Sequence, residues 1–327
     1  MGIEIIKYND NLYDKWNRFV LNDSFNGTFL QTKAFLNYHG SRFVDESVVF
    51  VKDGAIVAVC PATRIEDNGK VIFSSHCGST FGGLVVAKNY NKISDFQEIL
   101  NVFEAYLKAN GFSEVVLKQT SDLFCNDRNE LVYYTLFKEG YLNYDELSFA
   151  LEFPPANFDV VANFKSKTRN LYKASLKNGL VIKEIRTREE ITIFHKILTK
   201  SLLKHNAKPV HSVDELIDLQ ENRIKENVAF YGVFWGEKMI AGSMVFIIND
   251  IFHTQYLCAD PDYLYLKPMD YMDGSLIQMA YDRGFSGFSF GISTEEHGAV
   301  LNENLAKYKY GFGTNYYMNK TFYKVFK

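Results

Sequence analysis

Four basic residues with helical spacing are the first feature of this sequence that could do chemistry. Lys165, Arg169, Lys173 and Lys177 recur at every fourth position, so on a helix they form one cationic stripe with Tyr172 beside it. Guanidinium and ammonium groups suit phosphate oxygens, and the stripe could therefore hold the diphosphate of a nucleotide sugar or CoA, or the backbone of a tRNA. A solvated basic helix face is the alternative, and the spacing leaves both open.

Metal, disulfide and nucleotide-loop motifs are absent from the sequence. Its four cysteines stand far apart without a Cys-x-x-Cys pair, and no His-Glu-x-x-His occurs. The glycine-rich stretches 80–84 and 311–313 form neither a Walker loop nor a Gly-x-Gly-x-x-Gly fingerprint. We therefore expect reduced thiols, no metal ion and no nucleotide hydrolysis.

Composition and charge limit the class of protein further. Of 327 residues, 47% are hydrophobic and 23% are charged, which is typical of a folded chain long enough for two domains. Thirty-six basic and thirty-nine acidic side chains give a net charge of -3, so no global field attracts DNA, and phosphate binding must be local. The near-apolar stretch Met239–Ile248 is shorter than the roughly 18 residues that span a bilayer. We expect a cytoplasmic protein without a membrane span or a DNA partner.

A weak internal repeat indicates how the chain is organised. Each half contains a hairpin at a glycine turn, a third strand, an amphipathic helix, a Gly-Phe helix stop and a buried strand. The corresponding segments are 52–64 and 235–248 for the hairpins, 71–75 and 252–258 for the third strands, 93–110 and 270–283 for the helices, and 114–118 and 287–290 for the last strands. The repeat predicts a duplicated unit of about 150 residues.

The predicted fold class is a mixed α/β (α+β-like) protein of two tandem units. Each unit has a mostly antiparallel central sheet flanked by helices. Pro154-Pro155 ends a strand-like run and precedes a helix-rich stretch, so we place the boundary between residues 1–153 and 154–327.

Three segments carry a resemblance to a known family. Residues 27–39 (GTFLQTKAFLNYH) are similar to a "Gln-Ser-x-x-Trp" helix segment, and residues 167–179 (KTRNLYKASLKNG) are similar to a basic helix that opens a second domain. Residues 288–291 (FSFG) and 305–313 (LAKYKYGFG) are similar to a closing "Phe-Gly … Phe-Lys-x-Gly-Phe-Gly" signature. In this order they resemble the FemABX-like double-GNAT acyltransferase family, a branch of the GNAT superfamily.

The resemblance implies an N-acyltransferase that moves an acyl or aminoacyl group to a primary amine of a cell-envelope precursor, with acyl-CoA or aminoacyl-tRNA as donor. Family members of known activity use aminoacyl-tRNA to lengthen peptidoglycan side chains, and related sequences are thought to acylate amino sugars. His39 stands where the peptidoglycan enzymes commonly have a lysine, and Thr120 stands where they tend to have an acidic residue. These departures favour an amino-sugar acceptor over a tRNA-dependent peptidoglycan peptidyltransferase. A non-catalytic protein that binds nucleotide sugars or peptides is the alternative of another class.

The resemblance also implies the catalytic residues. Lys309 would stabilise the oxyanion of ester or thioester aminolysis. Tyr256 lies on the strand that lines the acyl site in GNAT folds, where its phenol could donate to the acyl oxygen or the leaving group. Glu296, in the loop after the strand 287–290, could take the proton of the ammonium. For each of the three, an ordinary core or surface position is the alternative.

The candidate substrate-binding residues lie in the matching segments or, for Lys165, just before the second of them. They are His39, Lys165, Arg169, Tyr172, Lys173 and Tyr308. Ordinary GNAT enzymes cradle the CoA pyrophosphate in a basic, glycine-rich loop at a helix N-terminus. The corresponding stretch 259–270 holds two prolines and several acidic residues but one lysine, which makes conventional CoA binding doubtful.

Overall fold

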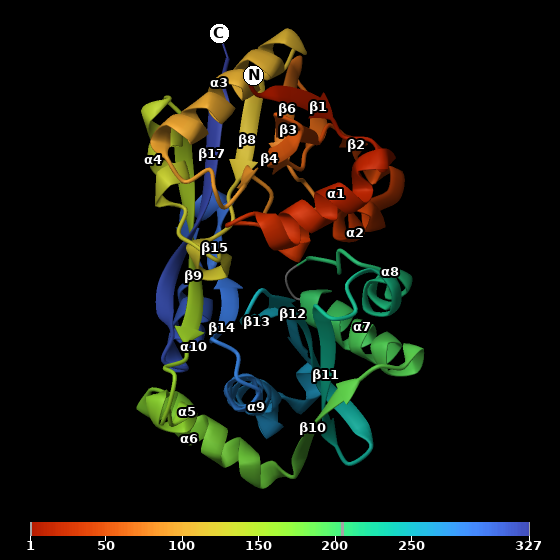
Figure 1. The fold of residues 1–327 in the computed structure, drawn as a ribbon. Helices are drawn as coiled ribbons and strands as arrows, with labels where there is room; N and C mark the ends of the chain where they lie inside the picture. Colours follow the sequence, from red (N-terminus) through yellow and green to blue (C-terminus); the bar gives the residue numbers. More distant parts are fainter. Residues whose placement is uncertain (1, 204–205, 327) are drawn as a thin grey trace. The chain divides into compact units, whose positions relative to one another are not determined.

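The chain divides into two compact units in the computed structural model, which describes residues 2–203 and 206–326 (Figure 1). The first unit contains the residues up to 146 together with those from 318 onward, and the second contains residues 147–317. The sequence-based division at 153/154 had assigned the C-terminal strand to the second unit. Residues 321–325 instead pair with strand β8 of the first unit, so the end of the chain returns there.

The first unit combines two sheets with the long helix α3. One sheet has the strand order β1-β3-β4-β7, and the other strands follow the order β17-β8-β6-β5-β2. The strands are β1 (Glu4–Lys7), β2 (Val44–Asp45), β3 (Val48–Lys52), β4 (Ala55–Cys60), β5 (Thr63–Asp67), β6 (Lys70–Ser75), β7 (Val85–Val86), β8 (Glu114–Lys118) and the end of β17 (Asn315–Val325). The helices are α1 (Tyr13–Arg18), α2 (Lys33–Leu36), α3 (Ile93–Ala109) and α4 (Glu130–Lys138).

The second unit is built on one sheet with the strand order β10-β11-β12-β13-β14-β9. Its strands are β9 (Leu142–Glu152), of which residues 147–152 belong here, β10 (Leu180–Ile185), β11 (Val228–Trp235), β12 (Lys238–Ile248), β13 (Ile251–Ala259) and β14 (Gly287–Ile292), with the small hairpin β15 (Thr294–Glu295) and β16 (Val300–Leu301). Its helices are α5 (Val160–Asn163), α6 (Ser166–Ser175), α7 (Arg188–Leu203), α8 (Val213–Asp218), α9 (Pro268–Asp282) and α10 (Glu303–Gly311).

The predicted repeat is present in part. Hairpins β3/β4 and β11/β12 turn at the expected glycines and helices α3 and α9 form, but the run expected to complete the first hairpin divides into β4 and β5, which lie in different sheets. Along the chain α3 lies between the parallel strands β6 and β8, and α9 lies between the parallel strands β13 and β14. Gly111 and Gly284 have φ of 76° and 80°, and the amide N–H of the phenylalanine after each donates back to the helix's last turn. The mixed α/β fold class is therefore correct.

Helices α7 and α9 cover opposite faces of the second sheet (Figure 1). Phe194 of α7 packs against Phe230 of β11, whereas the neighbouring Tyr231 belongs to the core that includes Met272 and Leu276 of α9. Successive side chains of a strand point to opposite faces, so the sheet is buried between two helical layers.

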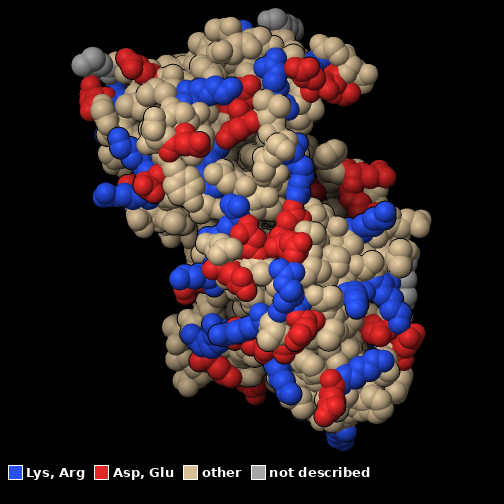
Figure 2. All heavy atoms as spheres, turned by 90° about the vertical axis from the view of Figure 1, so that its right-hand side faces the viewer, with Lys and Arg blue, Asp and Glu red and all other residues tan. Residues whose placement is uncertain are grey.

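Charged side chains do not separate into regions of one sign on the face shown in Figure 2. Lysine and arginine are interspersed there with aspartate and glutamate. This distribution matches the small net charge and provides no extended basic surface on that face.

Candidate functional site

Strands β13 and β14 pair over only three residues, and the candidate site lies beyond the end of that pairing. The last partners are His253 and Ser289, although β13 continues to Ala259 and β14 to Ile292. The His253 ring lies 3.1 Å from the Ser289 hydroxyl, measured from Nδ1 to Oγ, and the Thr254 hydroxyl donates to the carbonyl of Ser289. Beyond this point β14 pairs with β9 alone, and its carbonyls are available to other groups.

Lys309 of α10 occupies that position. Its side chain is 4% exposed, and its Nζ donates to the carbonyl oxygens of Ile292 at 2.5 Å and Gly291 at 3.1 Å. Within residues 2–203 and 206–326, no carboxylate lies within ion-pair distance of this ammonium. Burial lowers the pKa of Lys309 to about 8, and the charge of Asp273 opposes that shift.

Asp273 of α9 is a site residue that the sequence did not single out. It is fully buried, and the Tyr308 hydroxyl donates to its Oδ2 at 2.5 Å. Burial raises the pKa of this carboxyl to about 7, while the Tyr308 hydrogen bond and the Lys309 charge lower it and Asp270 raises it. Tyr308, expected to bind substrate, therefore directs its hydroxyl to a buried acid beside Lys309.

Three buried polar atoms near the end of β14 and on α9 have no hydrogen-bond partner in the described part of the chain. They are Asp273 Oδ1, Ser293 Oγ and Thr294 Oγ1. An unsatisfied buried polar atom costs about 1–3 kcal/mol, so such atoms normally bind water or a ligand. Ser293 and Thr294 directly follow Gly291 and Ile292, the residues whose carbonyls accept from Lys309.

Tyr256 belongs to a different cluster from Lys309. It lies on β13 after an irregularity in the pairing with β12, and its hydroxyl is 2.7 Å from Nδ1 of His211. Burial raises the pKa of Tyr256 to about 12, so the phenol stays protonated at neutral pH and can donate. Its contacts are with the loop that precedes α8 rather than with α10.

Glu296 is exposed in the turn between β15 and β16. Glu296 and His297 both have left-handed backbone, with φ of 51° and 55°, and Gly298 follows with φ of 89°. Two consecutive non-glycine residues in this region are strained, and such strain is common at functional sites. The carboxylate is accessible to solvent, as a general base requires, whereas the Lys309 ammonium contacts the carbonyls of Gly291 and Ile292.

The basic residues of the predicted stripe differ in position and surroundings. Arg169 and Lys173 lie in α6, Lys165 is its N-cap, and Lys177 lies in the 3-10 turn that follows. Lys173 is exposed, Lys165 at the N-cap lies with Nζ 4.7 Å from the Tyr310 ring centroid, and Arg169 donates to the carbonyl of Ala162. Tyr172 is 7% exposed and packs against Phe164 and the backbone of Gly274, where an added Cβ would lie 2.4 Å from its ring. Tyr172 thus faces the core, whereas the basic side chains face outward.

His39 lies in the first unit and is 6% exposed. Its Nε2 is 2.9 Å from the carbonyl oxygen of Gly78, and its ring stacks against His76. Burial lowers the pKa of His39 to about 4. It is a neutral, buried imidazole, unlike the lysine that stands at the matching position of the peptidoglycan enzymes.

Two structural searches complete the description of the site. Among the described residues, no three His, Cys, Asp or Glu side chains are grouped so that they could hold a metal ion. None of the described helices combines the length and the apolar character needed to cross a membrane.

Comparison with known proteins identifies a matching domain model and similar folds. Residues 162–309 match the family model described as "Acetyltransferase (GNAT) domain", and a search of curated protein sequences finds no significant match. FemX is 11% identical in sequence, with a TM-score of 0.72 over 99% of this chain and 97% of FemX. L-PGS from Bacillus licheniformis is 11% identical, with a TM-score of 0.61 over 98% of this chain and 92% of that one.

A third solved structure shares the duplicated architecture. A tandem GNAT protein from the clavulanic acid biosynthesis pathway is 8% identical, with a TM-score of 0.54 over 99% of this chain and 98% of that one. The predicted FemABX-like, tandem-GNAT architecture is thus confirmed at the level of the fold. Residues 162–309 thus match a GNAT acetyltransferase domain model, and the chain as a whole has the tandem-GNAT fold seen in FemX.

Proposed function

We propose that this protein transfers an acyl or aminoacyl group to a primary amine of a cell-envelope precursor, with Lys309 at the reacting carbonyl. The observation that carries the proposal is the buried ammonium of Lys309, held by two backbone carbonyls and by no carboxylate among the described residues. A cation without a counter-charge, in a region of low dielectric, stabilises a developing oxyanion more strongly than one already neutralised.

The proposed reaction is aminolysis of an ester or thioester. The amine nitrogen attacks the acyl carbon, an amide C–N bond forms, and the C–O or C–S bond to the leaving group breaks. Lys309 stabilises the oxyanion that forms between these two events. The ammonium proton passes to a base, for which Glu296 is our candidate, and the leaving group departs as an alcohol or thiol after protonation, for which Tyr256 is our candidate.

The start of α9 argues against phosphate binding at the position that ordinary GNAT enzymes use. Asp260 and Asp262 precede this helix and both accept from Lys200, at 2.5 and 2.7 Å. Asp270 lies in the first turn of α9. Carboxylates at a helix N-terminus compete with phosphate for the positive end of the dipole, so we assign donor or acceptor phosphate to Lys165, Arg169 and Lys173 on α6.

An amino sugar is the acceptor that we favour, and acyl-CoA or aminoacyl-tRNA remains the donor class. The second candidate is tRNA-dependent peptidyl transfer of the FemABX type, which the fold shared with FemX supports. The buried, neutral His39 supports the first candidate, because it cannot replace a lysine that contacts an anionic peptidoglycan precursor.

The first test is activity of a Lys309→Met variant. Purified protein is incubated with acetyl-CoA and amino sugars, with release of thiol as the readout, and with aminoacyl-tRNA and a UDP-linked muropeptide, with peptide mass as the readout. Where wild type is active, Lys309→Met should lose about 10²-fold in rate. Lys307→Met is the matched control, because Lys307 lies two residues away on α10 and forms an exposed pair with Glu303.

Calorimetric titration with the same ligands separates an enzyme from a binding protein. Saturable binding of acyl-CoA that is weakened in Arg169→Ala supports a CoA-dependent enzyme. Binding of the UDP-linked ligands with no turnover under any condition, and with no effect of Lys309→Met, contradicts the proposed catalysis and favours a non-catalytic binding protein.

A further inference from the structure

The first unit contains a small polar pocket that plays no part in the proposed chemistry of the second unit. We call it the His39 pocket. It has a volume of about 40 Å³ and is lined by Lys33, Leu36, Asn37, His39, Gly40, Phe43, Asp45 and His76. A water molecule needs about 10–15 Å³ of such space, so the pocket has room for a group of about three heavy atoms.

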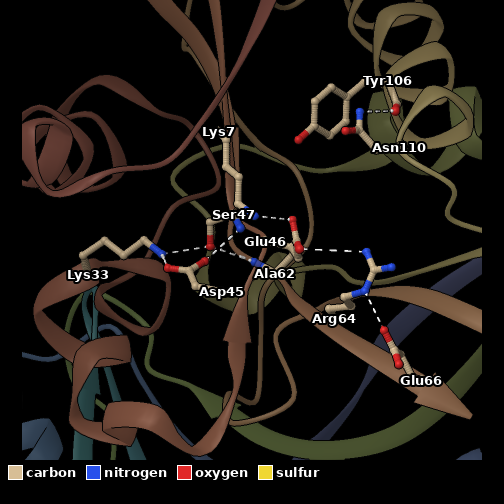
Figure 3. Close-up of polar contacts among 10 residues, drawn as sticks. All are labelled: Lys7, Lys33, Asp45, Glu46, Ser47, Ala62, Arg64, Glu66, Tyr106 and Asn110. Atoms are coloured by element: carbon tan, nitrogen blue, oxygen red, sulfur yellow. Dashed lines mark hydrogen bonds and ion pairs between the residues drawn. The ribbon is translucent and has the colours of Figure 1, made fainter.

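One wall of the pocket is formed by the ion pair of Lys33 and Asp45. Lys33 is 1% exposed, and its Nζ donates to Asp45 Oδ2 at 2.5 Å and to Ser47 Oγ at 2.8 Å (Figure 3). The rings of Tyr8 and Trp16 lie 4.0 and 5.0 Å from the same ammonium. All three N–H groups of Lys33 therefore have a partner within the unit, and the pair contributes no net charge to the pocket.

Asp45 keeps acceptor capacity at this wall. Its Oδ1 accepts from the amide of Ser47 and its Oδ2 from Lys33, but a carboxylate has about four acceptor positions (Figure 3). Its side chain is 44% exposed, unlike that of Lys33. Asp45 can therefore accept a further hydrogen bond from a molecule in the pocket.

The opposite wall holds two histidines whose tautomers are set by one glycine. The Gly78 carbonyl can only accept, so His39 Nε2, at 2.9 Å from it, carries the proton and His39 Nδ1 is a bare acceptor. The Gly78 amide donates to His76 Nδ1 at 3.2 Å, so the proton of His76 is on Nε2. A Cβ at residue 78 would lie 2.0 Å from His39 Nε2, and only glycine fits there.

Both imidazole rings are neutral, and the His39 ring has a nitrogen that lacks a hydrogen-bond donor. Burial lowers the pKa of His39 to about 4 and that of His76 to about 3, so neither ring is cationic at neutral pH. His39 Nδ1 is buried and has no hydrogen-bond partner in the described part of the chain. A bare nitrogen of this kind lacks a donor, which a bound molecule would supply.

We propose that the His39 pocket binds a neutral primary carboxamide. Its polar groups include two acceptors, His39 Nδ1 and Asp45, one donor, His76 Nε2–H, and the side-chain amide of Asn37, which can donate and accept. A primary carboxamide offers the complement, with two N–H donors on one nitrogen and one carbonyl acceptor, and its three heavy atoms match the volume. A neutral pocket lends no net charge to hold a carboxylate or an ammonium ion. This inference rests on the first unit alone and is independent of the proposed acyl transfer.

The test is a ligand titration of the full chain followed by NMR. With ¹⁵N-labelled histidine, propionamide should shift the His39 Nδ1 resonance in a saturable way, with a Kd in the range of about 1–100 mM for so small a probe. Propionate, propylammonium and 1,2-propanediol at equal concentration should not saturate. Saturation by the diol in place of the amide, or by none of the four probes, would overturn the assignment.

Two variants test the roles of the named atoms. His39→Phe keeps a ring but removes the acceptor, and propionamide should then shift the His76 resonance with an affinity at least about tenfold lower. His195→Phe is the matched control, because His195 lies in the second unit, where its Nε2 donates to the His211 carbonyl. An unchanged affinity in His39→Phe contradicts the proposal. If that variant does not fold, the four-probe titration of the wild type still decides.

Discussion

Among the described residues two lysines are buried, one in each unit, and the protein accommodates their charges differently. Lys33 is 1% exposed, with a carboxylate, a hydroxyl and two aromatic rings around its ammonium. Lys309 is 4% exposed and donates to two backbone carbonyls only. Burial lowers the pKa of both, but at Lys33 the partner Asp45 strongly opposes the shift.

The difference indicates which lysine is structural and which is available for chemistry. The charge of Lys33 is already neutralised by Asp45, so we interpret this ion pair as part of the structure of the first unit. The ammonium of Lys309 has dipoles but no counter-charge, so part of its field is left for an anionic group that forms nearby. A buried lysine without a carboxylate costs stability, and that cost is typical of a functional position.

The largest expected effect is the loss of turnover in Lys309→Met. Lys309→Met should reduce turnover about 10²-fold while the thermal transition stays cooperative, because the methionine side chain has a similar length and no charge. Turnover and thermal unfolding are measured on the same preparations. A rate equal to that of Lys307→Met would show that the unpaired charge has no part in the reaction.

Stability at neutral pH should change in opposite directions at the two sites. Lys33→Met leaves Asp45 and Ser47 without their donor and should cost about 2–3 kcal/mol, less than for a fully buried pair because Asp45 is partly exposed. Lys309→Met removes a buried charge without an ion partner and should be neutral or stabilising. Urea unfolding of both variants measures the change in the free energy of unfolding. Equal losses in the two variants would contradict the assignment of Lys33 as the structural lysine.

Sequence patterns predicted the fold well because the duplicated unit repeats local signals. The hairpin glycines, the apolar period of α3 and the Gly-Phe stops at residues 111 and 284 act over a few residues, and all of these elements form as expected. The return of β17 to β8 was missed, because strand pairing over about 200 residues leaves no mark in local composition.

The site was predicted less completely, for reasons of distance along the chain. The motif identified Lys309, but the surroundings of that residue depend on Asp273, which reads locally as one more acid on an amphipathic helix. In the fold Asp273 is buried and accepts from the hydroxyl of Tyr308, 35 residues away. Likewise Tyr172 lies beside the basic stripe in sequence, yet it packs on Gly274, where the absence of a side chain makes room for its ring.

Asp273 provides a second test of the surroundings of Lys309, because its charge acts on the pKa of Lys309. Its folded pKa of about 7 exceeds its ordinary value, so the folded state holds a proton that the unfolded state has lost. Stability should therefore fall by about 2 kcal/mol as the pH rises from 5 to 7, and Asp273→Asn should remove this fall. Unfolding by urea across this range, with exposed Asp282→Asn as control, measures it; an identical pH profile in both variants would contradict the shift.

The smallest expected effect concerns the titration of Lys309 itself. Its folded pKa of about 8 lies below the ordinary 10.5, so above pH 8 the folded state has released a proton that the unfolded state retains. Stability should rise by about 1.5 kcal/mol between pH 8 and 9.5, and this rise should be absent from Lys309→Met but present in Lys307→Met. Burial also lowers the pKa of Lys33, so Lys33 contributes to the same alkaline rise, although Asp45 opposes the shift. An alkaline limb of the stability profile that is unchanged in Lys309→Met would mean that the Lys309 ammonium is better solvated than its contacts indicate.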